Sequence, residues 1–294
     1  MALIGGLRWS RDEKDWCTNT LQDDFGDAGF PTDGKLCDSE DWDEVTYRLV
    51  AQYNISDDVM VFASVAEGFK GGGFNNSASD TNGDYMGDTI VSFDPETSIA
   101  YEIGVKSTAM NDRLQLNGSA FYTDYEDFQI QTLTLEYGLQ IANVGDAETM
   151  GLEAELSFWP TDGLVLMANY THLDAELTSG GFDGNDLAYA PEHTYSVGAN
   201  YDHQFLGGTM NWFAVYNYTD DFYHEANNEN AEDGFGLLNA RVSYTPADGN
   251  WELAIAGDNL LDEEYAASRA DFGLGQQLHW GYKRMLRAEF NIWF

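Results

Sequence analysis

The twelve residues KRMLRAEFNIWF, Lys283 to Phe294, alternate strictly between two kinds of side chain. One face carries Leu286, Ala288, Phe290, Ile292 and Phe294, and the other carries Lys283, Met285, Arg287, Glu289, Asn291 and Trp293. A period of two residues is typical of a β-strand that has one apolar face. The same alternation recurs in EVTYRLVAQY (Glu44–Tyr53), SIAYEIGVK (Ser98–Lys106) and TYSVGANY (Thr194–Tyr201). The sequence therefore predicts an all-β protein.

Twelve strands of this kind are predicted along the chain, and their connections alternate between short and long. The strands run roughly over 2–10, 43–54, 58–69, 96–107, 112–133, 139–159, 163–174, 193–203, 208–219, 234–245, 250–259 and 280–294. The long connections are 11–42, 70–95, 175–192, 220–233 and 260–279, and the link at 136–138 is an exception to the alternation. Such alternation is typical of transmembrane barrels, in which periplasmic turns are short and external loops are long.

Soluble sandwiches also contain period-two strands, but their apolar faces pack into a core. Strand length and aromatic placement favour a transmembrane barrel. Strands of about ten residues suit a tilted membrane crossing, whereas soluble strands have about five or six. Aromatic residues also stand near many strand ends, as an interfacial belt would place them: Trp9, Trp42, Tyr122, Trp159, Tyr170, Tyr201, Tyr218, Tyr244 and Trp251. We therefore expect a transmembrane antiparallel β-barrel, and a soluble β adhesin is an alternative.

Composition narrows the possible partners. The chain carries 51 acidic and 13 basic side chains, a formal net charge of -38, so we expect no nucleic-acid partner because phosphates would be repelled. Aromatic residues make up 14% of the chain, which argues against disorder. No apolar run is long enough for a transmembrane helix, and we expect no basic-then-apolar leader before the first strand. We expect this start to lie inside a longer protein.

Two local features have structural interpretations. Cys17 and Cys37 lie in one acidic stretch without a nearby histidine, so they fit a disulfide in an oxidising compartment rather than a zinc site, with two free thiols as the alternative.

The run AEGFKGGGFN, Ala66 to Asn75, lacks the residue order of a phosphate-binding loop. We expect it to mark a strand that leaves the membrane. Its glycines would permit bends with positive φ, and Lys70 would reach lipid phosphates or water.

Five longer segments, taken in order, carry a family resemblance. They are ALIGGLRWSRDEKDW (Ala2–Trp16), VFASVAEGFKGGGFN (Val61–Asn75), DPETSIAYEIGVKS (Asp94–Ser107), NVGDAETMGLEAEL (Asn143–Leu156) and GDNLLDEEY (Gly257–Tyr265). Together they resemble the C-terminal half of TonB-dependent outer-membrane receptors, with Trp9 in place of the family's Tyr and Leu261 in place of its Phe. The terminal Phe294 resembles the end signal that the barrel assembly machinery recognises.

The resemblance implies that residues 1–294 form a single partial domain, about twelve strands of a 22-stranded barrel. The N-terminal plug and the box that TonB grips would be absent from this chain. An arc of twelve strands would have unpaired edges at 2–10 and 282–294, and unpaired backbone groups are costly in lipid. We therefore expect either an open curved sheet or a strained closure of the first strand on the last.

The resemblance also implies a function. The family takes up scarce ligands, foremost iron–siderophore complexes, across the outer membrane of Gram-negative bacteria. Energy would come from the TonB–ExbB–ExbD complex through the missing plug. Expected partners are outer-membrane lipid, the barrel assembly machinery and a small-molecule ligand such as a metal chelate. The alternative is a self-contained twelve-stranded passive channel.

Candidate site residues are few. The histidines are scattered over His172, His193, His203, His224 and His279, so we assign no catalytic residue and expect no enzyme. Asp80, Asn82, Asp84 and Asp88 have spacings similar to a calcium loop without its full pattern, and a solvated acidic loop is the alternative. No other cofactor is expected. The loop candidates for ligand contact are Phe182, Phe222, Tyr223, His224, Tyr265 and Phe272, although ordinary loop packing is the favoured interpretation of each. The acidic loops disfavour a bare anion as ligand.

Overall fold

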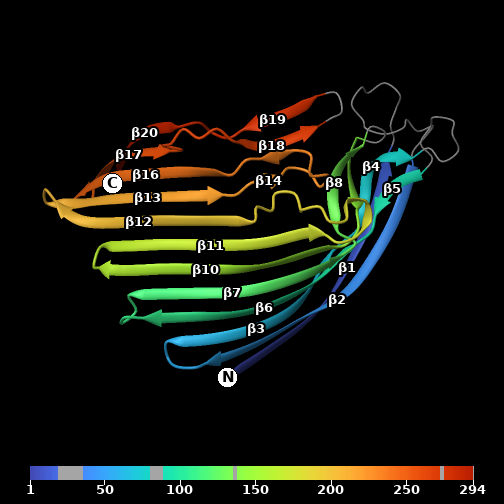
Figure 1. Ribbon diagram of the computed structural model, residues 1–294, viewed down its shortest axis with the longest axis horizontal. Helices are drawn as coiled ribbons and strands as arrows, with labels where there is room; N and C mark the ends of the chain where they lie inside the picture. The colour runs from blue at the N-terminus through green and yellow to red at the C-terminus, as the bar shows by residue number, and fades with distance from the viewer. Residues whose placement is uncertain (19–35, 80–88, 135–137, 272–274, 294) are drawn as a thin grey trace.

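The computed structural model describes residues 1–18, 36–79, 89–134, 138–271 and 275–293. Its main strands are β1 (Ala2–Thr18), β2 (Leu36–Asn54), β3 (Val59–Lys70), β6 (Glu96–Ala109), β7 (Leu114–Glu126), β10 (Ala147–Thr161), β11 (Leu164–Leu177), β12 (His193–Phe205), β13 (Gly208–Thr219), β16 (Phe235–Pro246), β17 (Trp251–Asp258) and β20 (Met285–Ile292). They form one twelve-stranded sheet in this order, and consecutive members pair antiparallel (Figure 1). The predicted all-β, antiparallel fold class is confirmed.

Short turns join the main strands at one end of the sheet (Figure 1). The turn between β12 and β13 has only two residues, Leu206 and Gly207, with φ of 47° and 77°. A two-residue turn with positive φ at both positions follows the right-handed twist of the flanking strands. This turn fixes the register that places Phe205 opposite Gly208.

Small hairpins extend the long connections at the other end of the sheet. They are β4 (Gly73–Ser79) with β5 (Thr89–Phe93), β8 (Gln129–Thr134) with β9 (Gly138–Asn143), β14 (Phe222–Tyr223) with β15 (Ala231–Glu232), and β18 (Ala266–Asp271) with β19 (Gln276–Trp280). A single turn of 3-10 helix, η1 (Gly180–Phe182), lies between β11 and β12. Among the described residues, no helix combines the length and the apolar composition needed to span a membrane.

The predicted bounds of five strands were wrong. The predicted strands 112–133 and 139–159 each break in two, because Asp127 and Gly145 adopt φ of 54° and 130° and turn the chain out of the main ladder. The link at 136–138 therefore belongs to one long connection between β7 and β10. The alternation of short and long connections has no exception there. The predicted last strand also divides, because residues up to Trp280 pair with β18 and β20 begins at Met285. Finally, β1 and β2 continue into the polar residues that were expected to be loop.

The two faces of the sheet differ in polarity. One face is concave: six neighbouring strands, β2 to β11, line a hollow of about 520 Å³ with charged and polar side chains and with a few apolar ones, such as Met60 and Phe62. The opposite, convex face exposes large apolar side chains, including Leu7, Ile103, Leu152, Val197 and Ile255. An apolar surface that continues from strand to strand exceeds what a water-facing monomer tolerates. The convex face therefore suits lipid.

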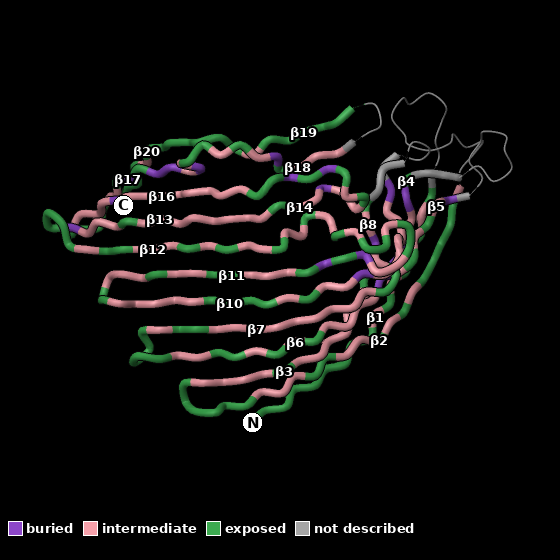
Figure 2. Tube along the Cα trace, viewed as in Figure 1, coloured by how far each residue is buried: buried purple, intermediate pink, exposed green. Residues whose placement is uncertain are grey.

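The described residues contain little dry core. The buried apolar residues are Ile90, Ala147, Ala175, Leu177, Ala254, Ala256 and Ala266, and all but two of these are alanines. A sandwich would bury large side chains between two sheets. The main strands consist mostly of intermediate and exposed residues (Figure 2), and many of their large apolar side chains are exposed. This excludes the sandwich architecture for the described part of the chain.

The sheet is open in the part of the chain that the structure describes. There β1 pairs only with β2, and β20 pairs only with β17. Of the two expected outcomes, the open curved sheet is therefore observed. A passive channel made by this sheet alone would require pairing between β1 and β20, which these residues do not show.

The glycine-rich run marks the end of a strand, as expected, because β3 ends at Lys70; the backbone of its glycines differs from the expectation. None of Gly71, Gly72 and Gly73 has positive φ. Instead, a Cβ at Gly72 would lie 2.6 Å from the carbonyl oxygen of Phe93 and 2.8 Å from the Trp42 ring. The glycines thus allow the chain to pass close to β2 and β5 where β3 ends. Lys70 pairs with Glu96, with 3.3 Å between Nζ and Oε2, rather than pointing only to lipid or water.

The two cysteines face each other across the extended β1–β2 hairpin. Cys17 lies directly opposite Cys37 in the register, and a disulfide joins them. The bridge closes a segment with a sequence separation of 20 residues. It therefore ties β1 to β2 immediately before the connection between them.

Candidate functional site

The concave hollow combines polar side chains of both charge signs with apolar ones such as Met60 and Phe62. Arg48 and Lys106 line it together with Glu102, Glu153 and Glu155. Arg48 comes from β2 and Lys106 from β6, and β3 pairs with both of these strands. The order of strands in the sheet therefore brings side chains that are far apart in the sequence to the same hollow. A concave surface that combines apolar side chains with a few polar groups is a typical place for a small-molecule ligand. The sequence alternation predicted strands here but did not indicate that these side chains share one hollow.

A network of polar side chains lies where β3 ends, β6 begins and β7 ends, next to the long loops. Glu96 accepts a hydrogen bond from the backbone N–H of Gln129 (2.7 Å) in addition to its contact with Lys70. The Gln129 amide donates to the carbonyl oxygen of Asp94 (2.8 Å). Asn75 exchanges two hydrogen bonds with the backbone of Ile141 (2.8 and 2.9 Å). Because buried polar groups lose stability when left unpaired, this network holds the β4–β5 and β8–β9 hairpins in fixed positions.

An aromatic cluster stands on the loops that follow β11 and β13. Tyr189 contacts Phe222 and His224, with ring centroids 5.7 and 5.2 Å apart. The Phe222 and His224 rings are 5.0 Å apart. The N–H of Tyr189 donates to the carbonyl oxygen of Tyr223 (2.8 Å) and so ties the two loops together. The structure thus brings together three of the predicted loop residues, and Tyr189 is a member that the sequence did not single out.

His224 connects this cluster to the next hairpin. Its side chain is fully buried, and Nε2 lies 3.7 Å from Oε2 of Glu232. The same carboxylate pairs with Arg269 at 2.8 Å and accepts the N–H of Ala266, also at 2.8 Å. Burial lowers the pKa of His224 below its usual value, against the opposing effect of Glu232. His224 is therefore a packing partner within the loops and presents no surface to a ligand in this conformation.

The remaining predicted residues are dispersed. Phe182 lies in η1, and Tyr265 stacks on Phe235 with 4.3 Å between ring centroids. Phe272 lies outside the described residues. The same is true of the predicted calcium ligands Asp80, Asn82, Asp84 and Asp88 and of the terminal Phe294.

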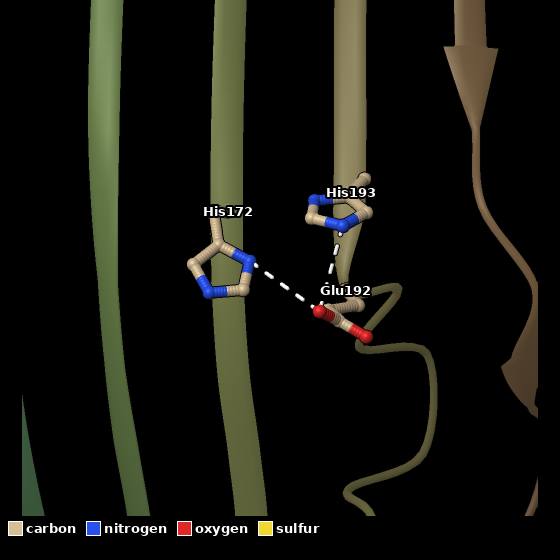
Figure 3. Close-up of side chains that lie close together, drawn as sticks. All are labelled: His172, Glu192 and His193. Atoms are coloured by element: carbon tan, nitrogen blue, oxygen red, sulfur yellow. Dashed lines mark ion pairs between the residues drawn. The ribbon is translucent and has the colours of Figure 1, made fainter.

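Sequence reasoning missed a cluster made by two of the scattered histidines. His172 near the end of β11 lies directly opposite His193 at the start of β12, and their rings are 5.0 Å apart. Glu192 reaches back between them, with one carboxylate oxygen 3.7 Å from Nδ1 of His172 and 3.4 Å from Nε2 of His193 (Figure 3). The sequence does show Glu192 next to His193 at the start of a strand. That pair points to a cluster only once the strand register places His172 opposite His193.

Comparisons with known proteins agree with this architecture. Residues 2–260 match the family described as TonB dependent receptor-like, beta-barrel. The chain is 27% identical over 273 residues to the pesticin receptor of Yersinia enterocolitica, covering 89% of this chain and 37% of that receptor. It is 25% identical over 236 residues to PiuA of Acinetobacter baumannii, a probable TonB-dependent siderophore receptor, covering 76% of this chain and 31% of PiuA.

The fold agrees with a solved structure. The ferric yersiniabactin uptake receptor FyuA from Yersinia pestis superimposes with a TM-score of 0.83 at 22% identity, covering 99% of this chain and 42% of FyuA. The chain thus spans between about three tenths and two fifths of the length of these relatives, and its twelve strands correspond to part of their barrel. It lies in the outer membrane of Gram-negative bacteria, as its relatives do. With the family pattern covering most of its length, the chain belongs to the TonB-dependent receptor-like β-barrel family.

Proposed function

We propose that this chain forms part of the barrel of a receptor that takes up a metal–siderophore complex, with energy supplied through TonB. The observation that carries the proposal is the concave face, which carries charged and polar side chains, on a sheet whose convex face suits lipid. In a closed barrel of the same family, that concave face lines the path across the membrane. Relatives named as siderophore receptors supply the class of ligand.

The charge of the loops restricts the ligand further. The chain has a net charge of -38, and like charges repel across a binding surface. Arg48 and Lys106 lie among glutamates in the hollow, so they do not form a strong anion site. A neutral or cationic metal chelate therefore fits better than a bare anion. Aromatic side chains of the loop cluster, Phe222 and Tyr223 among them, would contact its organic part.

The test is uptake by the complete receptor. The full gene is expressed in a strain that lacks its own siderophore receptors, and uptake of radioactive iron is measured with a panel of ferric siderophores. At least one chelate should be accumulated in cells with TonB and not in cells without it. Uptake that is independent of TonB, or no uptake of any chelate by correctly inserted receptor, would contradict the proposal.

A double variant tests the loop cluster. Phe222→Ala with Tyr223→Ala should raise the KM for the transported chelate at least tenfold while the protein still inserts. Leu206→Ala at the opposite, short-turn end is the matched control and should leave the KM unchanged. Equal effects of both changes would show that the loop residues act only through stability.

A further inference from the structure

The cluster of His172, Glu192 and His193 has the chemistry and spacing of a metal site. Two imidazole nitrogens and a carboxylate oxygen are a donor set that zinc uses, with a fourth position left open. Zinc bonds to such atoms are about 2.0–2.2 Å long, which places tetrahedral ligand atoms about 3.4 Å apart. The measured separations from the Glu192 oxygen are 3.7 and 3.4 Å, and all three ligand atoms lie within 4.8 Å of one another.

The two rings are already arranged for this role. Nδ1 of His193 lies 3.1 Å from the hydroxyl of Tyr170, which fixes the ring and leaves Nε2 directed at Glu192. Metal-binding histidines commonly have their second ring nitrogen held in this way by a neighbouring group. Nδ1 of His172 is shielded from solvent and has no hydrogen-bond partner. A buried polar atom without a partner carries a cost that a bound ion would remove.

The electrostatic surroundings favour a cation. A cavity of about 260 Å³ is lined by His172 and Glu192 together with Asp174, Asp186 and Asp221. No lysine or arginine lines this cavity, and no ion pair to a lysine or arginine neutralises its carboxylates among the described residues. Four carboxylates around one cavity repel each other, and a divalent ion offsets that repulsion.

The register places the cluster on the convex face. His172 shares this face with Tyr170 and Leu166. The cross-strand pair His172–His193 lies next to the pair Tyr170–Tyr195 on this face, on the side nearer the long loops. Tyr195 in turn stacks on Tyr218, with 5.0 Å between ring centroids. A belt of tyrosines marks the interface between hydrocarbon and head groups. The cluster therefore lies at the head-group level of the outer leaflet, on the opposite side of the sheet from the concave hollow.

We propose that His172, Glu192 and His193 bind a divalent transition-metal ion of the zinc class on the outer rim of the barrel. The ion is resident rather than transported, because the site faces away from the concave hollow. It links the end of β11 to the start of β12 and so fixes the loop 178–192 between them. Cu²⁺ should bind more tightly than Zn²⁺, following the usual order of divalent metals at nitrogen and oxygen donors.

The test is metal binding by the complete receptor, purified in detergent without lipopolysaccharide. Isothermal titration with Zn²⁺ should show one site, and His172→Ala or His193→Ala should each weaken binding at least tenfold. Tyr170→Phe should weaken it by about tenfold or more, through loss of the group that orients His193. Electron paramagnetic resonance of the Cu²⁺ form should show two coupled nitrogens in the wild type and one in either histidine variant.

His203→Ala is the matched control. His203 lies on the same face of the same strand, ten residues or about 33 Å further along, and stacks on Tyr201. This variant should bind Zn²⁺ like the wild type. Recovery of each variant from the outer membrane as a heat-modifiable barrel shows that it has folded. The proposal is overturned if the wild type binds no more Zn²⁺ than the folded His172→Ala/His193→Ala variant, or if His203→Ala loses as much binding.

Discussion

Oε2 of Glu232 lies 2.8 Å from Nη2 of Arg269, and this ion pair joins the β14–β15 hairpin to the β18–β19 hairpin. The Glu232 side chain is only 6% exposed, so its charge depends on Arg269 and on the N–H of Ala266. Removing one partner leaves the other buried and unpaired, which costs more than an exposed pair would contribute. The contact therefore holds together loops that are remote in sequence.

Glu232→Gln should loosen both hairpins without unfolding the sheet. We expect the local opening free energy of residues 222–232 and 266–270 to fall by about 1–3 kcal/mol, because a buried charged hydrogen-bond partner is lost. Hydrogen exchange followed by mass spectrometry measures this. Glu229→Gln changes an exposed carboxylate on the same loop and should have no effect. Unchanged exchange in Glu232→Gln would show that the pair does not couple the hairpins.

The buried His224 makes the same region sensitive to pH. Burial lowers the pKa of His224 in the folded loops, so the opened state binds the proton more readily. The stability of the closed loops should therefore be full above the unperturbed pKa, about 6.5, and decline as the pH falls below it. Glu232 and Glu225 oppose the shift, and Arg269 reinforces it. Hydrogen-exchange protection should decrease between pH 7 and pH 5 in the wild type and remain level in His224→Phe.

The sequence predicted the sheet well because its information is local. Period-two alternation in segments such as 194–201 shows which residues of a strand share a face. One apolar face on each strand is enough to predict a sheet with an apolar and a polar side. The predicted strand ends were wrong where polar residues nevertheless continue the backbone pairing. Asp12 and Asp41 suggest a loop by composition, yet backbone pairing with the neighbouring strand continues through both.

The candidate sites were harder to predict, because they depend on which strands lie side by side. His172 and His193 are 21 positions apart, and only the antiparallel register places them opposite each other. Glu232 and Arg269 likewise meet through two hairpins that carry little periodic signal. Tyr189 contacts the rings of Phe222 and His224. Its N–H donates to the carbonyl oxygen of Tyr223, and no side-chain pattern reveals this backbone hydrogen bond.

Gly72 provides a test of close packing at the end of β3. Gly72→Ala would place a Cβ 2.6 Å from the carbonyl oxygen of Phe93, and backbone cannot move away as easily as a side-chain tip. We expect a loss of about 1–3 kcal/mol, as for other overpacking substitutions, measured by denaturant unfolding of the folded receptor. Gly181→Ala is the control, since a Cβ there meets nothing within 4 Å. Equal stability of the two variants would disprove the steric explanation.

The Cys17–Cys37 disulfide should stabilise the projecting end of the β1–β2 hairpin. Its closed segment, with a sequence separation of 20, corresponds to about 3 kcal/mol in the chain-entropy account. Cys17→Ala with Cys37→Ala should increase hydrogen exchange over residues 12–18 and 36–42, while the register from Ala2 to Trp9 persists. Thiol labelling before and after reduction measures the bridge directly. Labelling of unreduced protein would contradict the pairing.

The strongest test of the architecture follows from the alternation in β12. Val197 and Tyr195 lie on the convex face, whereas Ser196 and Asn200 belong to the concave, polar face. Spin labels placed one at a time at these positions in the complete receptor, reconstituted in bilayers, should alternate in their collisions with oxygen and with a water-soluble nickel reagent. Oxygen concentrates in hydrocarbon, so the labels at Tyr195 and Val197 should favour oxygen and those at Ser196 and Asn200 should favour nickel. Because each side chain reverses its direction at every step along a strand, a shift of one residue would invert the pattern. Uniform accessibility at all four positions would show that this strand does not separate lipid from an aqueous interior.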